Sequence, residues 1–316
     1  MVNKKVVCLG GGVGTANLIK GLKQFFSNIA VIASMADDGG SSGRLRRLYN
    51  APPPGDLVVL MAQFVKNPYV VRLLTYRFPG SGKGEDAELY GHKLGNLIMI
   101  ALLSITEDFY KAIRLFQKIF SIKGDFLPAT REKVSICAKT IEGKLIYGES
   151  KIDLGKYSGK RILEKVFLEP TNAGANKKAV KSIMRAEIII AGPGDLYTTI
   201  LPVLIVEDIQ KALKKSKALK IFVVNVANKP FETKGYDVAD YINAVKRHLG
   251  SFPFDKIIAN SDFSIGIPKG YKYQYVSYKK AKKTSSIKLI TSDIVDRAFP
   301  LYHNSAQLAK TIVENI

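Results

Sequence analysis

A glycine-rich turn near the N-terminus has residue types and spacing that could do chemistry. Gly10, Gly11, Gly12 and Gly14 follow a short apolar stretch, and Thr15 comes directly after them. Glycines between a strand and a helix let backbone N–H groups approach an anion, and the helix dipole adds to the attraction. The turn therefore predicts a phosphate or diphosphate site, with a purely structural tight turn as the alternative. A dinucleotide fingerprint would have glycine in place of Thr15, which weakens an NAD(P) oxidoreductase hypothesis.

A second polar segment, ADDGGSSGRLR at 36–46, follows the next apolar stretch. Asp37 and Asp38 could hold a ribose or sugar hydroxyl, or a hard cation such as Mg²⁺ that keeps several waters. Serine hydroxyls can donate to ligand oxygens, and arginine can pair with phosphate. The alternative is a structural loop with an aspartate helix cap. The segment adds four candidate ligand-binding residues: Ser41, Ser42, Gly43 and Arg44.

The motifs PPPGD and GHKLGN supply three more polar candidates. Asp56 is either a functional carboxylate or the N-cap of a helix that runs to Val65. His92 is a candidate base, although a single histidine is more often a structural hydrogen-bonding group. Asn96 can bind a ligand or cap a helix.

Two later motifs, GPGDLYT and NVANKPFET, follow apolar stretches in the second half of the chain. Gly192 and Gly194 offer another backbone cradle, Asn225 can read a base edge, and Lys229 can neutralise phosphate. No nucleophile elbow, HExxH or kinase signature is present. The sequence therefore names no covalent nucleophile, and the candidate catalytic residues are carboxylates: Asp37, Asp38 and Asp56.

The elements that must position these residues follow a strand–helix rhythm. Short apolar stretches read as buried parallel strands at Lys5–Leu9, Ile29–Ser34, Glu187–Ala191, Lys220–Val226 and Lys256–Ala259. Most end at a small or polar residue, and open parallel sheets bind ligands outside the carboxyl ends of their strands. We expect an α/β fold, Rossmann-like and doubly wound, with a mostly parallel sheet. A β-hairpin insertion at about 130–150 and a lysine-rich part at 263–316 belong to one predicted domain, 1–316.

Composition excludes several classes of protein. The longest largely apolar stretches, 57–65 and 97–105, are far shorter than the roughly 20 residues of a membrane span. The first residues do not read as a signal peptide. Cys8 and Cys137 form no CxxC pair, so neither a disulfide framework nor a thiolate metal site is readable. These features predict a cytoplasmic protein without a membrane span.

The charge is strongly positive, because 48 Lys and Arg stand against 27 Asp and Glu, a net of +21. The stretch 263–292 has seven lysines, no carboxylate and four interleaved tyrosines. Basic and aromatic residues together are typical of single-strand nucleic-acid binders. We favour a lysine-rich surface over RNA binding, so nucleic acid is not an expected partner.

In this order, GGGVGT, ADDGGSSGRLR, PPPGD, GHKLGN, FLPAT, GES, GPGDLYT and NVANKPFET resemble the motifs of the YvcK family of gluconeogenesis factors, in the CofD-like superfamily. The resemblance runs from Lys4 to about Asn304 and implies a Rossmann-like fold. It implies a protein that binds UDP-sugars, notably UDP-N-acetylglucosamine, and supports cell shape and growth on gluconeogenic carbon sources. No catalytic reaction goes with this branch. Protein partners of cell-wall regulation and a homo-oligomer are compatible with it.

On the UDP-sugar hypothesis, the glycine turn with Gly11 would hold the diphosphate through Gly12, Gly14 and Thr15. Asp37, Ser41, Ser42 and Gly43 would hold the sugar or ribose, and Asn225 and Lys229 the nucleotide side. Tyr271 resembles a family tyrosine that contacts the sugar nucleotide. The CofD branch implies the alternative, a Mg²⁺-dependent transferase of a phospholactyl group from a nucleotide-linked donor, with Asp37 and Asp38 as candidate metal ligands.

The sequence departs from the family pattern at several positions. Val13 replaces a common threonine, and Val58 and Val59 replace an Arg-Asn pair. Tyr302 stands where the family has an arginine linked to UDP-sugar binding, and 227–231 replaces a Met-Thr-Gln-Pro-Gly run. Each lost charged contact costs about 1.5–3 kcal/mol. The resemblance therefore predicts weaker affinity or a changed ligand.

Overall fold

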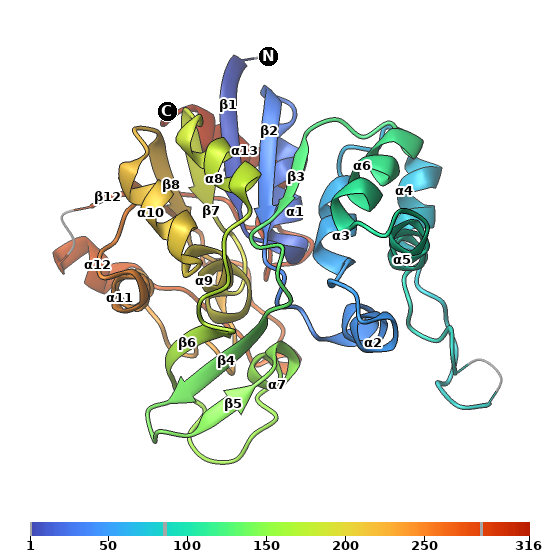
Figure 1. The fold of residues 1–316 in the computed structure, drawn as a ribbon. Helices are drawn as coiled ribbons and strands as arrows, with labels where there is room; N and C mark the ends of the chain where they lie inside the picture. The colour runs from blue at the N-terminus through green and yellow to red at the C-terminus, as the bar shows by residue number, and fades with distance from the viewer. Residues whose placement is uncertain (1, 85–86, 285–286) are drawn as a thin grey trace.

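A seven-stranded sheet forms the centre of the computed structural model, which describes residues 2–84, 87–284 and 287–316 (Figure 1). Its strand order is β12-β10-β8-β7-β1-β2-β3, and every neighbouring pair is parallel. The predicted α/β, doubly wound fold is confirmed, with a central sheet that is parallel throughout. The strands are β1 (Val2–Leu9), β2 (Phe26–Ala33), β3 (Asp125–Pro128), β7 (Ile188–Ala191), β8 (Leu219–Val223), β10 (Lys256–Asn260) and β12 (Lys288–Ser292).

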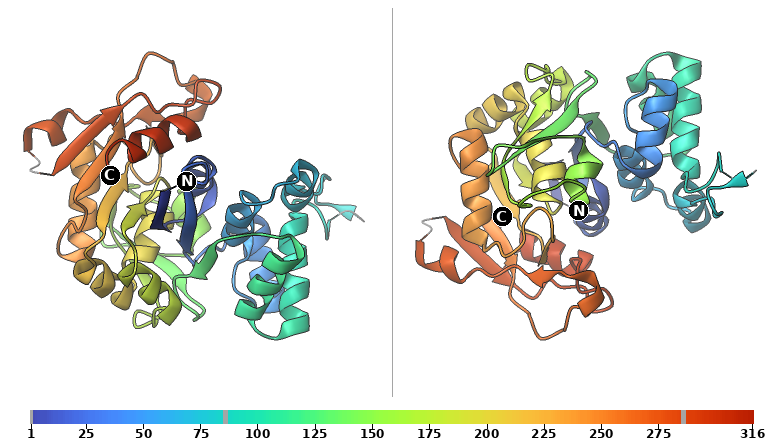
Figure 2. Two further views of the ribbon diagram at one scale, coloured as in Figure 1. Left: turned by 90° about the horizontal axis from the view of Figure 1, so that it is seen from above. Right: turned by 90° about the horizontal axis from the view of Figure 1, so that it is seen from below.

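Helices cover both faces of the central sheet, and the strands at its centre accordingly have apolar residues on both faces. Val6–Leu9 of β1 and all of β7 are buried, as expected for parallel strands between two helical layers. Helices α1 (Gly12–Leu22) and α13 (Ser305–Val313) pack together on one face. The other face is covered mainly by α8 (Lys177–Met184), α10 (Glu207–Lys215) and α11 (Val238–Leu249) (Figure 2).

Five α-helices in the described residues between β2 and β3 form a separate group at one side of the sheet (Figures 1 and 2). They are α2 (Gly40–Tyr49), α3 (Gly55–Ala62), α4 (Pro68–Thr75), α5 (Leu94–Thr106) and α6 (Phe109–Ile119). The helical spacing of apolar residues predicts two successive helices at 95–107 and 108–120, and α5 and α6 confirm both. Helix α2 begins inside the segment 36–46, for which a structural loop with an aspartate cap is the alternative prediction. Ser41 and Ser42 therefore lie in a first helical turn, and Gly39 is the N-cap.

The predicted hairpin insertion is present, and it belongs to a three-stranded antiparallel sheet of order β5-β4-β6. Strands β4 (Ser135–Thr140) and β5 (Leu145–Tyr147) form the hairpin, and β6 (Leu163–Glu169) is a third strand that sequence analysis did not predict. Helix α7 (Glu149–Asp153) follows the hairpin. Figure 1 places this small sheet and α7 beyond the carboxyl ends of the central strands.

Shorter elements complete the second half of the chain. Strand β9 (Ala227–Asn228) pairs antiparallel with β11 (Gln274–Tyr275), so part of the lysine-rich stretch lies beside the NVANKPFET loop. Residues 285–286 of that stretch lie outside the described residues. No helix in the described ranges has the length and apolarity to cross a membrane. The remaining elements are a π-helical turn (Leu196–Ile200), α9 (Leu201–Leu204), a 3₁₀ turn (Lys269–Tyr271) and α12 (Lys279–Thr284).

Candidate functional site

The strand order reverses beside β1, because the chain moves to β2 and β3 on one side and to β7, β8, β10 and β12 on the other. Such a switch point leaves a crevice between two strand ends, where α/β proteins bind ligands. Here the crevice is a cleft of about 220 Å³. Its lining includes Gly11, Gly12, Val13, Gly14, Pro193, Gly194, Asp195, Asn225, Lys229, Tyr273, Tyr302 and His303.

The turn after β1 and the turn after β7, which flank the cleft, are in direct contact. The Thr15 hydroxyl donates to the backbone oxygen of Pro193 at 3.1 Å, and a Cβ on Gly14 would lie 2.7 Å from that same oxygen. The backbone N–H of Gly194 donates to the side-chain oxygen of Asn225 at 2.9 Å. Glycine is therefore required at position 14 by close approach. Thr15 and the Asn225 oxygen are engaged inside the protein.

Gly192 and Gly43 have structural reasons of their own. Gly192 has a φ of +80°, and a Cβ there would lie 2.5 Å from the Val223 carbonyl oxygen. A Cβ on Gly43 would overlap the Asp38 backbone, against which the first turn of α2 packs. Neither residue is among those that line the cleft.

Asp56 does not cap its own helix, α3 (Gly55–Ala62), contrary to one of its two predicted roles. Pro54 is the N-cap of α3, and the Asp56 carboxylate instead lies against Gly11 and accepts a hydrogen bond from the Gly12 backbone. Burial, and then the charge of Asp37, raise the pKa of Asp56 to about 7. An internal carboxyl group thus occupies the N-terminus of α1, where the sequence predicts a phosphate.

Asp37 and Asp38 are adjacent in sequence, but their carboxylates face different elements. Asp37 accepts from the Gly39 backbone at 2.9 Å and from the Ser42 hydroxyl, within α2. Asp38 accepts from the Ser150 backbone at 2.8 Å and so holds α7 in place. Burial is the main cause of a raised pKa at Asp37. The charge of Asp38 adds to the rise in the pKa of Asp37, and the charge of Asp37 in turn helps to raise the pKa of Asp56. Asp37 thus interacts with both carboxylates.

More carboxylates gather at this edge of the sheet than the sequence analysis identified. Glu149 and Asp153 come from α7, Asp195 from the turn after β7, and Glu232 from the loop after β9. Burial, and then Asp37 and Asp153, raise the pKa of Glu149 to about 9. Glu149 and Glu232 stand within the motifs GES and NVANKPFET, which was the available signal. In a chain of net charge +21, this edge is locally acidic.

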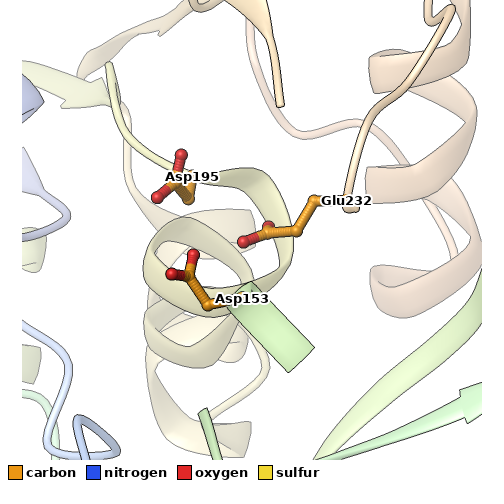
Figure 3. A group of neighbouring side chains, drawn as sticks. All are labelled: Asp153, Asp195 and Glu232. Atoms are coloured by element: carbon orange, nitrogen blue, oxygen red, sulfur yellow. The ribbon is translucent and has the colours of Figure 1, made fainter. Parts of the chain in front are cut away.

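Lys229 is the cation of this edge, and its partners are within the protein. Figure 3 shows Asp153, Asp195 and Glu232 turned toward one another. The Lys229 ammonium is paired with Asp153, lies 2.7 Å from Asp195 and lies 4.0 Å from Glu232. Although burial opposes the charged form, these carboxylates raise the pKa of Lys229 above its usual value. Its positive charge therefore already balances these three carboxylates. It would neutralise a phosphate only in addition to them.

Ser41, His92 and Asn96 bind one another. The Ser41 hydroxyl oxygen accepts from the Asn96 amide at 3.1 Å and the Lys93 backbone at 3.3 Å, and it lies 3.1 Å from His92 Nδ1. Because this oxygen already accepts twice, its proton is donated to an unprotonated Nδ1. Burial, followed by the charges of Arg44 and Arg77, lowers the pKa of His92. These contacts favour a structural role for a neutral His92.

Aromatic side chains stand at the mouth of the cleft. Tyr273 and Tyr302 line it, whereas Tyr271 is exposed and outside the lining. Tyr271 packs edge-on against Phe299, whose ring stacks on Tyr302 at 5.2 Å with 21° between planes. His303, also in the lining, is buried and within 3.0 Å of the Val224 carbonyl oxygen. Sequence analysis missed Tyr273, which is two residues from the tyrosine it chose.

The raised carboxyl pKa values predict how stability depends on pH. A carboxyl with a raised folded-state pKa favours folding while protonated, and this contribution is lost as pH rises through that pKa. For Asp56 the loss runs from the ordinary carboxyl pKa of about 4 up to pH about 7, and it is nearly complete by about pH 8. We expect Asp56→Asn to remove about 1 kcal/mol of the decline in unfolding free energy between about pH 6 and pH 8. Urea unfolding at both pH values measures it.

The matched control is Asp208→Asn, which removes an exposed carboxylate from α10. It should keep the wild-type decline with pH. An equal decline in the Asp56 and Asp208 variants would contradict the assignment.

The fold defines a doubly wound α/β protein, and a cleft lies at its switch point. A family model described as 2-phospho-L-lactate transferase CofD matches residues 6–295. The gluconeogenesis factor of Bacillus subtilis is 40% identical over 272 residues, which cover 86% of this chain and 82% of that relative. The gluconeogenesis factor of Halalkalibacterium halodurans is 35% identical over 324 residues, covering 99% and 97%. The chain therefore belongs to the CofD family, in its group of gluconeogenesis factors.

A solved structure agrees with this assignment. The crystal structure of a UPF0052 family protein from Bacillus halodurans superposes with a TM-score of 0.89 at 33% identity, and 99% of each chain is covered. The family resemblance in the motifs is thus confirmed over the whole length of the fold.

Proposed function

We propose that this chain is a nucleotide-binding regulatory protein of the gluconeogenesis-factor type, and that its ligand is a UDP-sugar such as UDP-N-acetylglucosamine. The observation that carries the proposal is the cleft of about 220 Å³ between two glycine turns at the switch point, with aromatic rings at its mouth. Backbone N–H groups at a helix N-terminus suit a diphosphate, and aromatic rings suit a nucleobase. The relatives are named gluconeogenesis factors, which links the proposal to gluconeogenesis.

The nucleotide end of the ligand would lie at the aromatic mouth. Tyr302 and Phe299 present a stacked pair of partly exposed rings, and Tyr273 lines the wall beside them. Stacking of a base on an aromatic side chain contributes about 1–3 kcal/mol. This compensates in part for the family arginine that Tyr302 replaces. It favours a planar base without requiring an added positive charge.

The diphosphate would lie beside Gly12, Gly14 and Gly194, close to two carboxyl groups. An ionised Asp56 would repel it, whereas a protonated Asp56 could donate to a phosphate oxygen. Asp195 is already balanced by Lys229 at 2.7 Å. Sugar hydroxyls, which are hydrogen-bond donors, suit the remaining carboxylate oxygens at this acidic edge. The ligand that fits is thus anionic at its centre and rich in hydroxyl groups at one end.

The second candidate is a Mg²⁺-dependent transferase of the CofD kind, and the neighbouring carboxylates of Asp37 and Asp56 favour it. Burial is the first cause of the raised pKa of both carboxyl groups, because it disfavours their charged forms. A cation between them would stabilise those charged forms. Oxygen ligands of this kind suit Mg²⁺, which would neutralise a nucleotide-linked donor. These two residues would hold the ion. A covalent nucleophile is not needed for group transfer by positioning and charge neutralisation.

Thermal unfolding with UDP-N-acetylglucosamine, UDP-glucose, UDP and GDP, each with and without Mg²⁺, separates the two functions. A ligand at 100 times its Kd stabilises a protein by about 2.7 kcal/mol, which shifts Tm by several degrees. We expect this shift with the UDP-sugars in the absence of Mg²⁺. We expect Tyr302→Ala to reduce it.

The control for that panel is Tyr69→Ala, which removes an exposed tyrosine from α4, away from the cleft. Its shift should equal that of the wild type. A shift with GDP that requires Mg²⁺ would favour the transferase, and no shift with any nucleotide would contradict both functions.

A further inference from the structure

A second hollow lies on the outer side of α2 and shares no lining residue with the glycine cleft. It has a volume of about 770 Å³. Arg44 and Arg47 project into it from α2, and Arg77 comes from the segment after α4. Phe78 and Tyr90 add aromatic surface. The hollow therefore combines three guanidinium groups with two rings on a concave surface.

None of these three arginines forms an ion pair within the part of the chain that the structure describes, which leaves out 85–86. Arg131, by contrast, pairs with Asp108 at 3.3 Å, and Arg297 pairs with Asp293 at 2.7 Å. No carboxylate is among the described residues that line the hollow. Among the described residues, these three positive charges therefore have no ion-pair partner.

Backbone carbonyl groups hold the guanidinium groups in place. Arg44 donates to the oxygen of Tyr90, and Arg77 donates to the oxygen of Gly91 at 2.5 Å. Arg47 makes a longer contact, 3.5 Å, to the backbone oxygen of Asp38. Each guanidinium has five N–H donors, so most donors remain for a ligand. Side chains that are already oriented lose less entropy when a ligand binds.

The segment that carries these carbonyl groups is itself well fixed. The backbone N–H of Gly91 donates to the oxygen of Phe78 at 2.9 Å, and that of Phe78 donates to the oxygen of His92 at 3.0 Å. His92 is anchored in turn by Ser41. The charges of Arg44 and Arg77 reach this buried histidine and help to lower its pKa. The local potential is therefore positive.

We propose that the arginine hollow is a binding site for a phosphate group with at least two negative charges, carried by a small molecule. Arginine pairs with phosphate oxygens through parallel N–H bonds, and its planar fork matches their geometry. Phe78 and Tyr90 offer apolar surface to the organic part of a phosphate ester. The site is distinct from the proposed UDP-sugar cleft and does not depend on that proposal.

Titration with pyrophosphate, followed by calorimetry and ³¹P NMR at constant ionic strength, tests the site. The variant Arg44→Gln/Arg77→Gln should weaken binding at least about tenfold, a loss of about 1.4 kcal/mol. The matched control Arg72→Gln/Arg185→Gln removes two exposed arginines outside the hollow. It should bind pyrophosphate like the wild type.

Two further variants keep the outcome interpretable. Arg47→Gln changes an exposed residue at the last turn of α2, so it should fold normally and still weaken binding. Gly14→Val obstructs the glycine cleft and should leave binding in the hollow unchanged. Loss of pyrophosphate binding in Gly14→Val alone, or equal affinity in the hollow and control variants, would overturn the proposal.

Discussion

Lys229→Met is expected to lower the unfolding free energy by about 3 kcal/mol, the scale seen when one partner of a buried ion pair is removed. The ammonium balances Asp153, Asp195 and Glu232, and Glu232 is buried. Glu232 also accepts from the Tyr197 backbone at 2.9 Å and the Thr198 hydroxyl at 2.7 Å. It therefore cannot turn toward water without losing these bonds. Urea unfolding of the variant and the wild type measures the difference.

The same substitution should create a cation site. Carboxylate oxygens of the three acidic residues lie within 4.8 Å of one another, and oxygen ligands in such a group suit Ca²⁺ or Mg²⁺. Without the lysine, Ca²⁺ should raise Tm in the variant, while the wild type should respond much less because its ammonium already occupies the position.

Lys217→Met, which changes an exposed lysine between α10 and β8, is the matched control. The double variant Lys229→Met/Asp195→Asn should recover part of the lost stability, since it removes one of the uncompensated carboxylates. A Lys229 variant as stable as the Lys217 variant would show that the ammonium is not the balancing charge.

Gly14→Val is expected to abolish detectable UDP-sugar binding, with an affinity loss of about 100-fold or more. The first atom of the new side chain would lie 2.7 Å from the Pro193 carbonyl oxygen, and the next atoms would enter the cleft. The obstacle is backbone, so the two turns must separate. Loss of two hydrogen bonds to a charged phosphate at about 1.5–3 kcal/mol each accounts for that factor.

Stability should fall by a smaller amount, about 1–3 kcal/mol, as for other substitutions that overpack a close contact. Gly266→Val is the matched control, because a Cβ there meets open space and the backbone is not in the left-handed region. Isothermal calorimetry with UDP-N-acetylglucosamine compares the two. Wild-type affinity in Gly14→Val would remove the glycine turn from the proposed site.

The sequence alone was sufficient for the parallel strands at the centre of the sheet and for the glycine turn after β1. A continuous apolar stretch that ends in glycine has few other solutions, because its burial and its turn are both local properties. Strands β3 and β12 were not predicted, because they lack such a local signal. Their short sequences, DFLP and KLITS, are stabilised by their neighbours in the sheet, so local propensity did not reveal them.

The chemistry of individual residues depended on the tertiary structure. Asp56 has the sequence context of a helix cap, yet it faces the turn after β1, and adjacent Asp37 and Asp38 accept bonds from different elements. Lys229 meets Asp153 across 76 positions of the chain. Composition and spacing report which groups are present and which elements they end. The parallel sheet decides which groups meet, because it brings the carboxyl ends of distant strands to one edge, and burial there sets their charges.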